Sequence, residues 1–273
     1  MIEKVQYVNH MGETIDFGTN GIYINENDLH DFAWTIASKN DRRSSFKKGI
    51  VKRTLPVILA CATDSSGIEA RNDLFEICEK DVLSEKYGKL IIGNYYLKCY
   101  ITESKSSKYT YTNRYAKITL TVQTDLPKWV KESTTRFGIE KSNAGRNLDY
   151  ENDFPYDYVS NILSKKLINA DFTDSNFRIL VYGACENPSV TINGHLYSVN
   201  VAINSGEYLL IDSVEKTILL YRTDGSTENC FKYRNRDSYV FEKIPPGELS
   251  VLTSSSFSFD VTVLEERSVP KWI

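Results

Sequence analysis

The last third of this 273-residue chain constrains the fold most, because short apolar runs there alternate with tight-turn residues. An Asn-Gly pair at 193–194 lies between alternating apolar residues. This is the strongest local signal for a two-residue hairpin, since both turn positions need positive φ. Further turn signals follow at 204–206, 224–225 and 245–247. Strands spaced by roughly ten residues predict an antiparallel β-sandwich or a jelly-roll-like domain.

The overall composition indicates a folded protein of two domains. Hydrophobic residues make up 41% of the chain and charged residues 25%, which suits buried cores and not a disordered chain. The 36 acidic and 33 basic residues leave a net charge of -3, which argues against a nucleic-acid-binding protein. No apolar run of about 18 residues and no signal-peptide pattern is present, so we expect synthesis and folding in the cytosol.

The residues that could carry chemistry are scattered. The five cysteines lack the Cys-x-x-Cys spacing of zinc sites and are expected to be free thiols. His10, His30 and His195 are far apart in the sequence, so no metal site is predicted. There is no Gly-x-Ser-x-Gly motif and no glycine-rich phosphate loop. The sequence therefore predicts no catalytic, cofactor-binding or metal-binding residues, and no enzyme.

The first half of the chain predicts a β domain with a single helix. The helix is expected at about 66–84, where Ser66 and Glu69 have the spacing of a capping box. Leu74, Cys78 and Val82 then recur at helical period and predict one buried stripe.

The domain boundaries follow from a change in composition. The polar residues from about 136 to 154 predict a linker. Residues 1–135 then form an N-terminal β-barrel or sandwich with the helix, and residues 155–273 form the C-terminal antiparallel sandwich. Within the first domain, the run at 40–49 is expected to be a basic, flexible loop.

Acidic and aromatic residues near the linker allow two alternatives. Paired carboxylates could form a glycosidase site on a β-sandwich. The candidate acids are Glu140, Asp149, Glu151, Asp153 and Asp157. Tyr156 and Tyr158 are candidate rings for stacking on a saccharide. We favour the simpler interpretation, in which the acids solvate a linker and the aromatic rings anchor it.

Several motifs carry a resemblance to a known family. The runs at 177–183, 206–213 and 244–247 and the ending at 266–272 stand in the order seen in phage distal tail proteins. These are the baseplate hub subunits of long-tailed phages that infect Gram-positive bacteria. Val269 stands where that family typically has an acid, and this departure affects one contact.

The resemblance implies a structural role in the virion. In this family the N-terminal domains form a ring, generally a hexamer, that joins the tail tube to the tail-associated hub protein. The C-terminal domain is galectin-like and holds receptor-binding or side-fibre proteins. The resemblance therefore implies a location at the tail tip of the virion, after synthesis in the host cytoplasm. A galectin-like fold does not by itself imply sugar binding.

A closed ring requires two different, complementary patches on each subunit. Arg42 and Arg43 are candidates for one patch, and Asp73 and Glu76 on the helix are candidates for the other. Two alternatives remain for the whole chain. It could be a carbohydrate-binding adsorption module of the tail tip, or an enzyme that degrades the cell wall.

Overall fold

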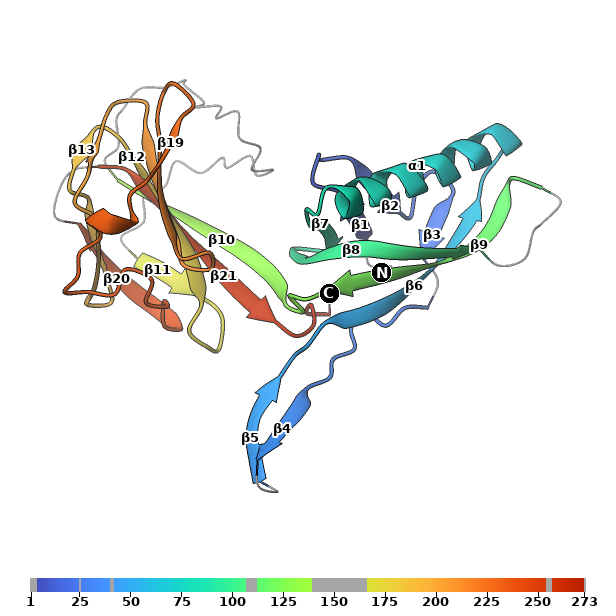
Figure 1. The fold of residues 1–273 in the computed structure, drawn as a ribbon, viewed down its shortest axis with the longest axis horizontal. Coiled ribbons are helices and arrows are strands. Elements are labelled where there is room, and N and C mark those ends of the chain that lie inside the picture. Colours follow the sequence, from blue (N-terminus) through green and yellow to red (C-terminus); the bar gives the residue numbers. More distant parts are fainter. Residues whose placement is uncertain are drawn as a thin grey trace. The chain divides into compact units, whose positions relative to one another are not determined.

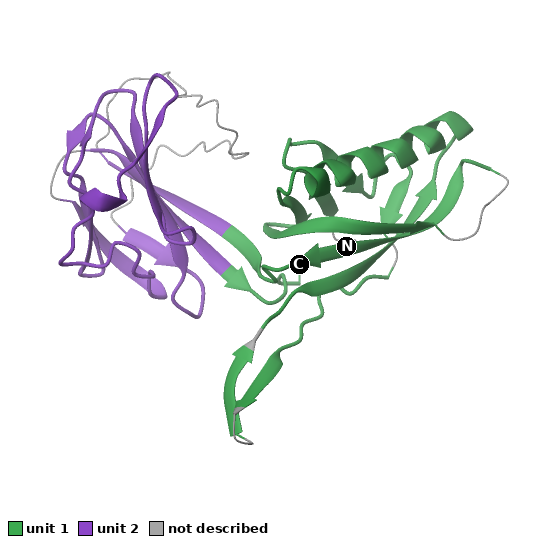
Figure 2. Ribbon diagram, in the orientation of Figure 1, with its two compact units in different colours: residues 1–131, 266–273 green, residues 132–265 purple. Residues whose placement is uncertain are grey.

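The protein is described by a computed structural model over residues 4–24, 26–39, 42–106, 112–138, 166–253 and 257–272. Antiparallel strands dominate these ranges, with one α-helix and one 3-10 helix (Figure 1), so the predicted mainly β class is confirmed. The chain divides into two compact units, residues 1–131 with 266–273 (unit 1) and residues 132–265 (unit 2) (Figure 2). No helix in the described ranges is both long and apolar enough to cross a membrane.

Unit 1 is built on two antiparallel arrays of strands that share β8. Its elements are β1 (Val5–Val8), β2 (Thr14–Phe17), β3 (Ile22–Ile24), β4 (Thr35–Lys39), β5 (Arg42–Lys47), β6 (Val51–Ala60), α1 (Asp64–Leu83), β7 (Gly88–Ile92), β8 (Tyr95–Ser106), β9 (Tyr115–Thr124) and the start of β10 (Trp129–Phe137). One array has the order β10-β8-β7-β1-β2 and the other the order β3-β6-β9-β8. The first half of β8 pairs with β7 and the second half with β9. This long strand therefore joins the arrays around one core.

Helix α1 packs on this core through one face only. Ala70, Leu74 and Cys78 are buried in the core of unit 1. Val82 was expected in the same stripe, but its side chain is exposed. The buried positions of α1 recur every three or four residues, as Gly67, Ala70, Leu74, Cys78 and Asp81. Val82 directly follows Asp81 and therefore lies about 100° further around the helix, on its solvent side.

The N-terminal cap of α1 lies three residues earlier than the sequence pattern predicts. Thr63 is the N-cap, and its Oγ1 accepts a hydrogen bond from the backbone N–H of Ser66. The Ser66 hydroxyl accepts in return from the Thr63 N–H. The capping box is therefore present, with Ser66 in its third position in place of a glutamate.

A buried carboxylate at the end of α1 attaches the helix to β1. Asp81 is fully buried, and its Oδ2 accepts a hydrogen bond from Tyr7 Oη at 2.5 Å. Its Oδ1 accepts from the His10 backbone N–H at 2.8 Å and lies 2.5 Å from His10 Nδ1. Burial and the bond to Asp81 raise the pKa of Tyr7, so its hydroxyl stays a donor. A Cβ at Gly88 would lie 2.3 Å from both Asp81 Oδ2 and Tyr7 Oη, so only glycine fits there.

Unit 2 is an antiparallel β-sandwich. Its elements are the rest of β10, β11 (Lys166–Asn169), β12 (Asn176–Tyr182), β13 (Cys185–Glu186), β14 (Ser189–Ile192), β15 (His195–Ser198), β16 (Ala202–Ile203), β17 (Tyr208–Asp212), β18 (Thr217–Tyr221), β19 (Thr227–Asn229), the 3-10 helix η1 (Phe231–Tyr233), β20 (Gly247–Thr253) and β21 (Phe259–Arg267). One sheet has the order β19-β18-β17-β12-β21-β10 and the other the order β11-β20-β14-β15. Both sheets contribute side chains to a single core.

The sequence patterns of unit 2 correspond closely to its strands. Phe177, Ile179 and Val181 of β12 are buried, and the residues between them are not. The turn between β14 and β15 is the expected Asn193-Gly194 pair, with φ of 48° and 82°. Positive φ at both positions is the condition for a type I′ hairpin turn.

Removing the Asp81 carboxylate is expected to destabilise unit 1. Asp81→Ala leaves Tyr7 Oη and the His10 N–H buried without an acceptor, which should lower the free energy of unfolding by about 3 to 5 kcal/mol. Glu69→Ala is the matched control, since Glu69 is exposed on the same helix and should change stability by less than about 0.5 kcal/mol.

Tryptophan fluorescence during urea denaturation measures this effect. All three tryptophans belong to unit 1, so the signal reports this unit alone. Equal midpoints for the Asp81 and Glu69 variants would contradict the structural role of Asp81.

Candidate assembly surface

The described histidines are used in structural contacts. His10 bonds to Asp81, and the His30 ring stacks on Trp272 with ring centroids 3.7 Å apart. His195 Nε2 lies 3.2 Å from Ser238 Oγ. A serine hydrolase needs such a pair, in which the imidazole accepts the proton of the serine hydroxyl. The Ser238 hydroxyl, however, donates to the Leu196 carbonyl oxygen at 2.6 Å, so its proton is not held by the imidazole. No group of three potential metal ligands gathers within the described ranges.

The cysteines are free thiols, as the sequence predicts. Burial raises the pKa of Cys78 to about 12 and also raises the pKa of Cys99. A thiol with such a pKa is protonated near neutral pH, and the thiolate is the reactive form. These two side chains therefore contribute to packing and are poor nucleophiles.

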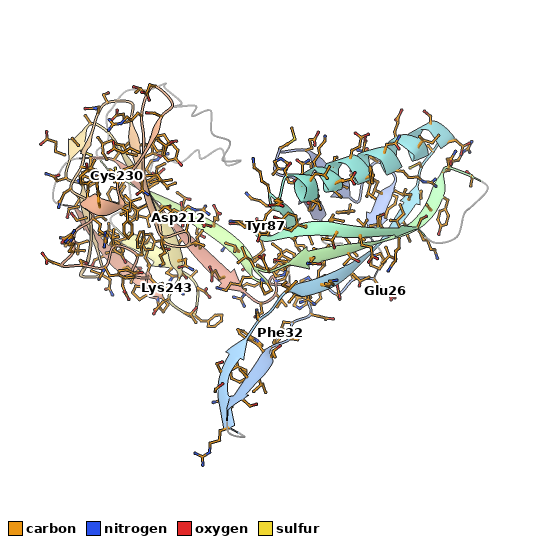
Figure 3. The ribbon with its side chains drawn as sticks, in the orientation of Figure 1. Glu26, Phe32, Tyr87, Asp212, Cys230 and Lys243 are labelled. Atoms are coloured by element: carbon orange, nitrogen blue, oxygen red, sulfur yellow. The ribbon has the colours of Figure 1, made fainter. Side chains whose placement is uncertain are left out.

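The acidic residues that could carry chemistry divide into two groups. Asp212, labelled in Figure 3, ends β17. Its Oδ2 pairs with Arg178 at 2.9 Å and its Oδ1 accepts the backbone N–H of Val214, so it is a structural strand-end residue. The candidate acids from Glu140 to Asp157 and the rings of Tyr156 and Tyr158 lie outside the described residues.

The segment expected to be a flexible basic loop instead forms a hairpin. Strands β4 and β5 make a two-stranded sheet of their own within unit 1 (Figure 1). Ile36 pairs across the strands with Phe46, and a bulge follows Ala37. The Ser44 hydroxyl donates to the Ala37 carbonyl oxygen at 2.8 Å and so stabilises the bulge. Cross-strand apolar pairing explains why this charged segment is ordered.

The hairpin exposes large apolar side chains. Ile36 is 60% exposed, Phe46 50% and Trp34 49%, and Phe32 at its base is also exposed (Figure 3). Trp34 and Phe46 meet edge to face, with centroids 6.4 Å apart. The Arg43 guanidinium lies 5.0 Å from the Phe46 ring centroid. We call this set of apolar side chains the hairpin patch.

This exposure has an energetic consequence. An isolated two-stranded hairpin is only marginally stable in water. A cluster of exposed aromatic and aliphatic side chains marks an interaction site more often than a free surface. The hairpin patch is therefore suited to being covered by another molecule.

Helix α1 carries a second exposed apolar surface. Ile68, Phe75 and Val82 are seven residues apart, which places them on one side of the helix, and all three are exposed. We call them the helix stripe. It lies beside the buried face formed by Leu74 and Cys78, so it belongs to the outside of unit 1.

The predicted interface charges accompany these two surfaces. Arg42 and Arg43 are exposed on β5, next to the hairpin patch. Asp73 and Glu76 are exposed on α1, near the helix stripe. None of these four side chains forms an ion pair with another described residue. The sequence predicted the charges but not the apolar side chains beside them, because it gave no sign that 40–49 is a strand.

The full length of the chain shares its fold with solved phage baseplate structures. No protein-family model matches it, and no curated protein does. The activated, calcium-bound baseplate of phage P2 contains a chain with 13% identity and a TM-score of 0.62, aligned over 99% of this chain and 100% of that one. The SPP1 Dit (gp 19.1) protein, described as a hub adsorption apparatus of phages infecting Gram-positive bacteria, has 10% identity and a TM-score of 0.59, with coverage of 98% and 100%. At these identities the likeness shows a common fold.

Alkylation by iodoacetamide should distinguish the cysteines. At pH 7.5 Cys78 and Cys99 are expected to stay unmodified in the native protein, because both are buried and their raised pKa values keep them protonated. The half-buried Cys61 serves as the control and should react first. Mass spectrometry of tryptic peptides reads out each site. Native labelling of Cys78 at the rate of Cys61 would contradict the raised pKa.

Proposed function

We propose that this chain is a structural hub protein of a phage tail tip, a distal tail protein whose copies assemble through unit 1 into a closed ring. The observation that carries the proposal is the full-length fold match to baseplate and Dit hub structures. The exposed apolar surfaces of unit 1 give such a chain a means of self-association. The role requires no bond-making chemistry, in agreement with the structural use of the described histidines and buried cysteines.

The ring follows from two unlike surfaces on one subunit. A closed ring uses heterologous contacts, so that one patch of each copy meets a different patch of the next. The hairpin patch and the helix stripe are such a pair, and both are apolar. In the proposed assembly, the hairpin of one copy lies on α1 of its neighbour, and the aromatic rings of Phe46 and Trp34 leave water on assembly.

The charges beside the two patches are complementary. Arg42 and Arg43 on the hairpin would face Asp73 and Glu76 of the neighbouring helix. Opposite charges at the rim of an apolar contact set its orientation and raise the association rate more than they raise affinity. The pairing therefore selects the hairpin-to-helix contact over a contact between two hairpins.

The remaining features of the proposal come from the family resemblance. The ring is a hexamer, and it connects the tail tube protein to the tail-associated hub protein. Unit 2, proposed to be galectin-like, anchors receptor-binding or side-fibre proteins. The protein is made in the host cytoplasm and is located at the tail tip of the virion.

Light scattering coupled to size-exclusion chromatography tests the ring. The unmodified chain is expected to elute as a closed oligomer, with a central hole in negative-stain images. The double variant Ile36→Ser and Phe46→Ser should shift the assembly midpoint to at least about 30-fold higher concentration, since buried aromatic anchors dominate interfaces. Leu252→Ser is the control, because Leu252 is equally exposed but lies in unit 2. A monomeric unmodified chain at high concentration would reject the ring.

A charge exchange tests the pairing of the two patches. Arg42→Glu with Arg43→Glu is expected to weaken assembly by placing acids opposite Asp73 and Glu76. Adding Asp73→Lys and Glu76→Lys should restore it, because the exchanged charges attract again. If the rings stay intact after the arginine reversal, the charge contact is rejected. The apolar contact is then tested by the serine variants alone.

A further inference from the structure

Unit 2 has a surface hollow that the assembly role does not use. It has a volume of about 400 Å³ and is formed by Lys216 and by parts of the segment from Phe231 to Phe241. Cys230 and Lys243 flank this segment in Figure 3. A volume of this size falls within the range of small-molecule sites. It is small compared with the surface that a stable protein partner covers.

Cations line this hollow in fixed positions. The Arg234 guanidinium lies 4.0 Å from the Phe231 ring centroid, and its Nη1 donates to the Phe231 carbonyl oxygen at 2.9 Å. Lys216 Nζ lies 5.6 Å from the Tyr239 centroid and 5.3 Å from the Phe241 centroid. A cation–π contact orients a cation but leaves its charge uncancelled. The hollow therefore presents ordered positive charge.

The other arginines of unit 2 that the structure describes are neutralised by carboxylates. Arg136 pairs with Asp260, Arg178 pairs with Glu132 and Asp212, and Arg222 pairs with Glu207 and Glu228.

The cations of the hollow have no such carboxylate. Lys216, Arg234 and Arg236 form no ion pair with any described residue. Asp237 belongs to the same segment and Glu242 directly follows it, but neither lines the hollow. The hollow is consequently a place of uncompensated positive charge, and an anion is the ligand it can neutralise.

The other lining groups suit a sugar ring. Tyr239 is 56% exposed and offers a flat apolar surface on which the C–H face of a saccharide can stack. Asn235 Oδ1 accepts the Asp237 N–H, while its Nδ2 donates to no other described residue and can reach a ligand hydroxyl. We propose that this hollow binds a saccharide that carries a phosphate or carboxylate group. Such a site would let unit 2 contact an acidic surface glycan.

Isothermal titration calorimetry on the full chain tests the ligand class. N-acetylglucosamine 1-phosphate is expected to bind, and its neutral parent N-acetylglucosamine should bind at least 10-fold more weakly. The affinity should fall as salt is raised, because the partly exposed charges are screened. Inorganic phosphate that binds as well as the sugar phosphate would overturn the saccharide part. An acidic glutamate peptide that binds more tightly would overturn the glycan class, and no binding of the sugar phosphate would overturn the site.

Variants of the residues that line the hollow test whether the sugar phosphate binds there. Arg236→Gln removes an exposed cation that forms no ion pair with a described residue and should weaken sugar-phosphate binding at least 5-fold. Arg234→Gln added to it should weaken binding further. Lys271→Gln is the control, an exposed cation in unit 1 that should leave the affinity unchanged. Unchanged binding by the double variant would reject the hollow as the site. Ring assembly, measured on the same samples by light scattering, should be unaffected, so this test fails or succeeds separately from the hub role.

Discussion

The buried carboxylate of Asp81 is the interaction on which unit 1 depends. A buried charge is tolerated only when its oxygens are hydrogen-bonded, and here they accept from β1 and from the turn that follows it. Tyr7 and His10 are donors from one segment, and Asp81 is an acceptor on another, so neither segment can shift without breaking bonds. The orientation of α1 about its own axis is set in this way. The residues that α1 presents to solvent are set by the same contacts.

The orientation of α1 determines which of its apolar side chains lie outside the core. The contacts of Asp81 hold α1 with Phe75 outward and 59% exposed. The hairpin of β4 and β5 shows the same feature, with Phe46 and Ile36 paired with each other and open to water. Side chains held outward by the fold on two separate elements are explained by contact with another molecule. The proposed self-assembly through unlike patches would account for both surfaces at once.

Local sequence patterns predicted elements such as α1 and the β14–β15 hairpin. They could not predict contacts between residues that are far apart in the sequence. The hairpin turn at Asn193-Gly194 depends on neighbouring residues, and it was predicted correctly. Asp81 was missed because an acid in a helix usually indicates a solvated position. Its spacing from Cys78 and Leu74 along the buried face was the available signal. The strand β5 was missed because its order depends on pairing with β4, and the sequence at 40–49 shows charge without alternation.

The net charge of -3 does not show which charged residues are paired within the fold and which are not. Arg136, Arg178 and Arg222 are paired with carboxylates of their own unit, so they contribute to the fold and little to the field outside it. The arginines of the β4–β5 hairpin and of the hollow on unit 2 form no ion pair with a described residue, and Arg43 and Arg234 lie against aromatic rings. Screened charges of this kind stabilise a fold by little. These unpaired cations act instead on other molecules, because a positive surface attracts an acidic one. The small net charge therefore hides a division of the cations into those that are paired within the fold and those that are available to other molecules.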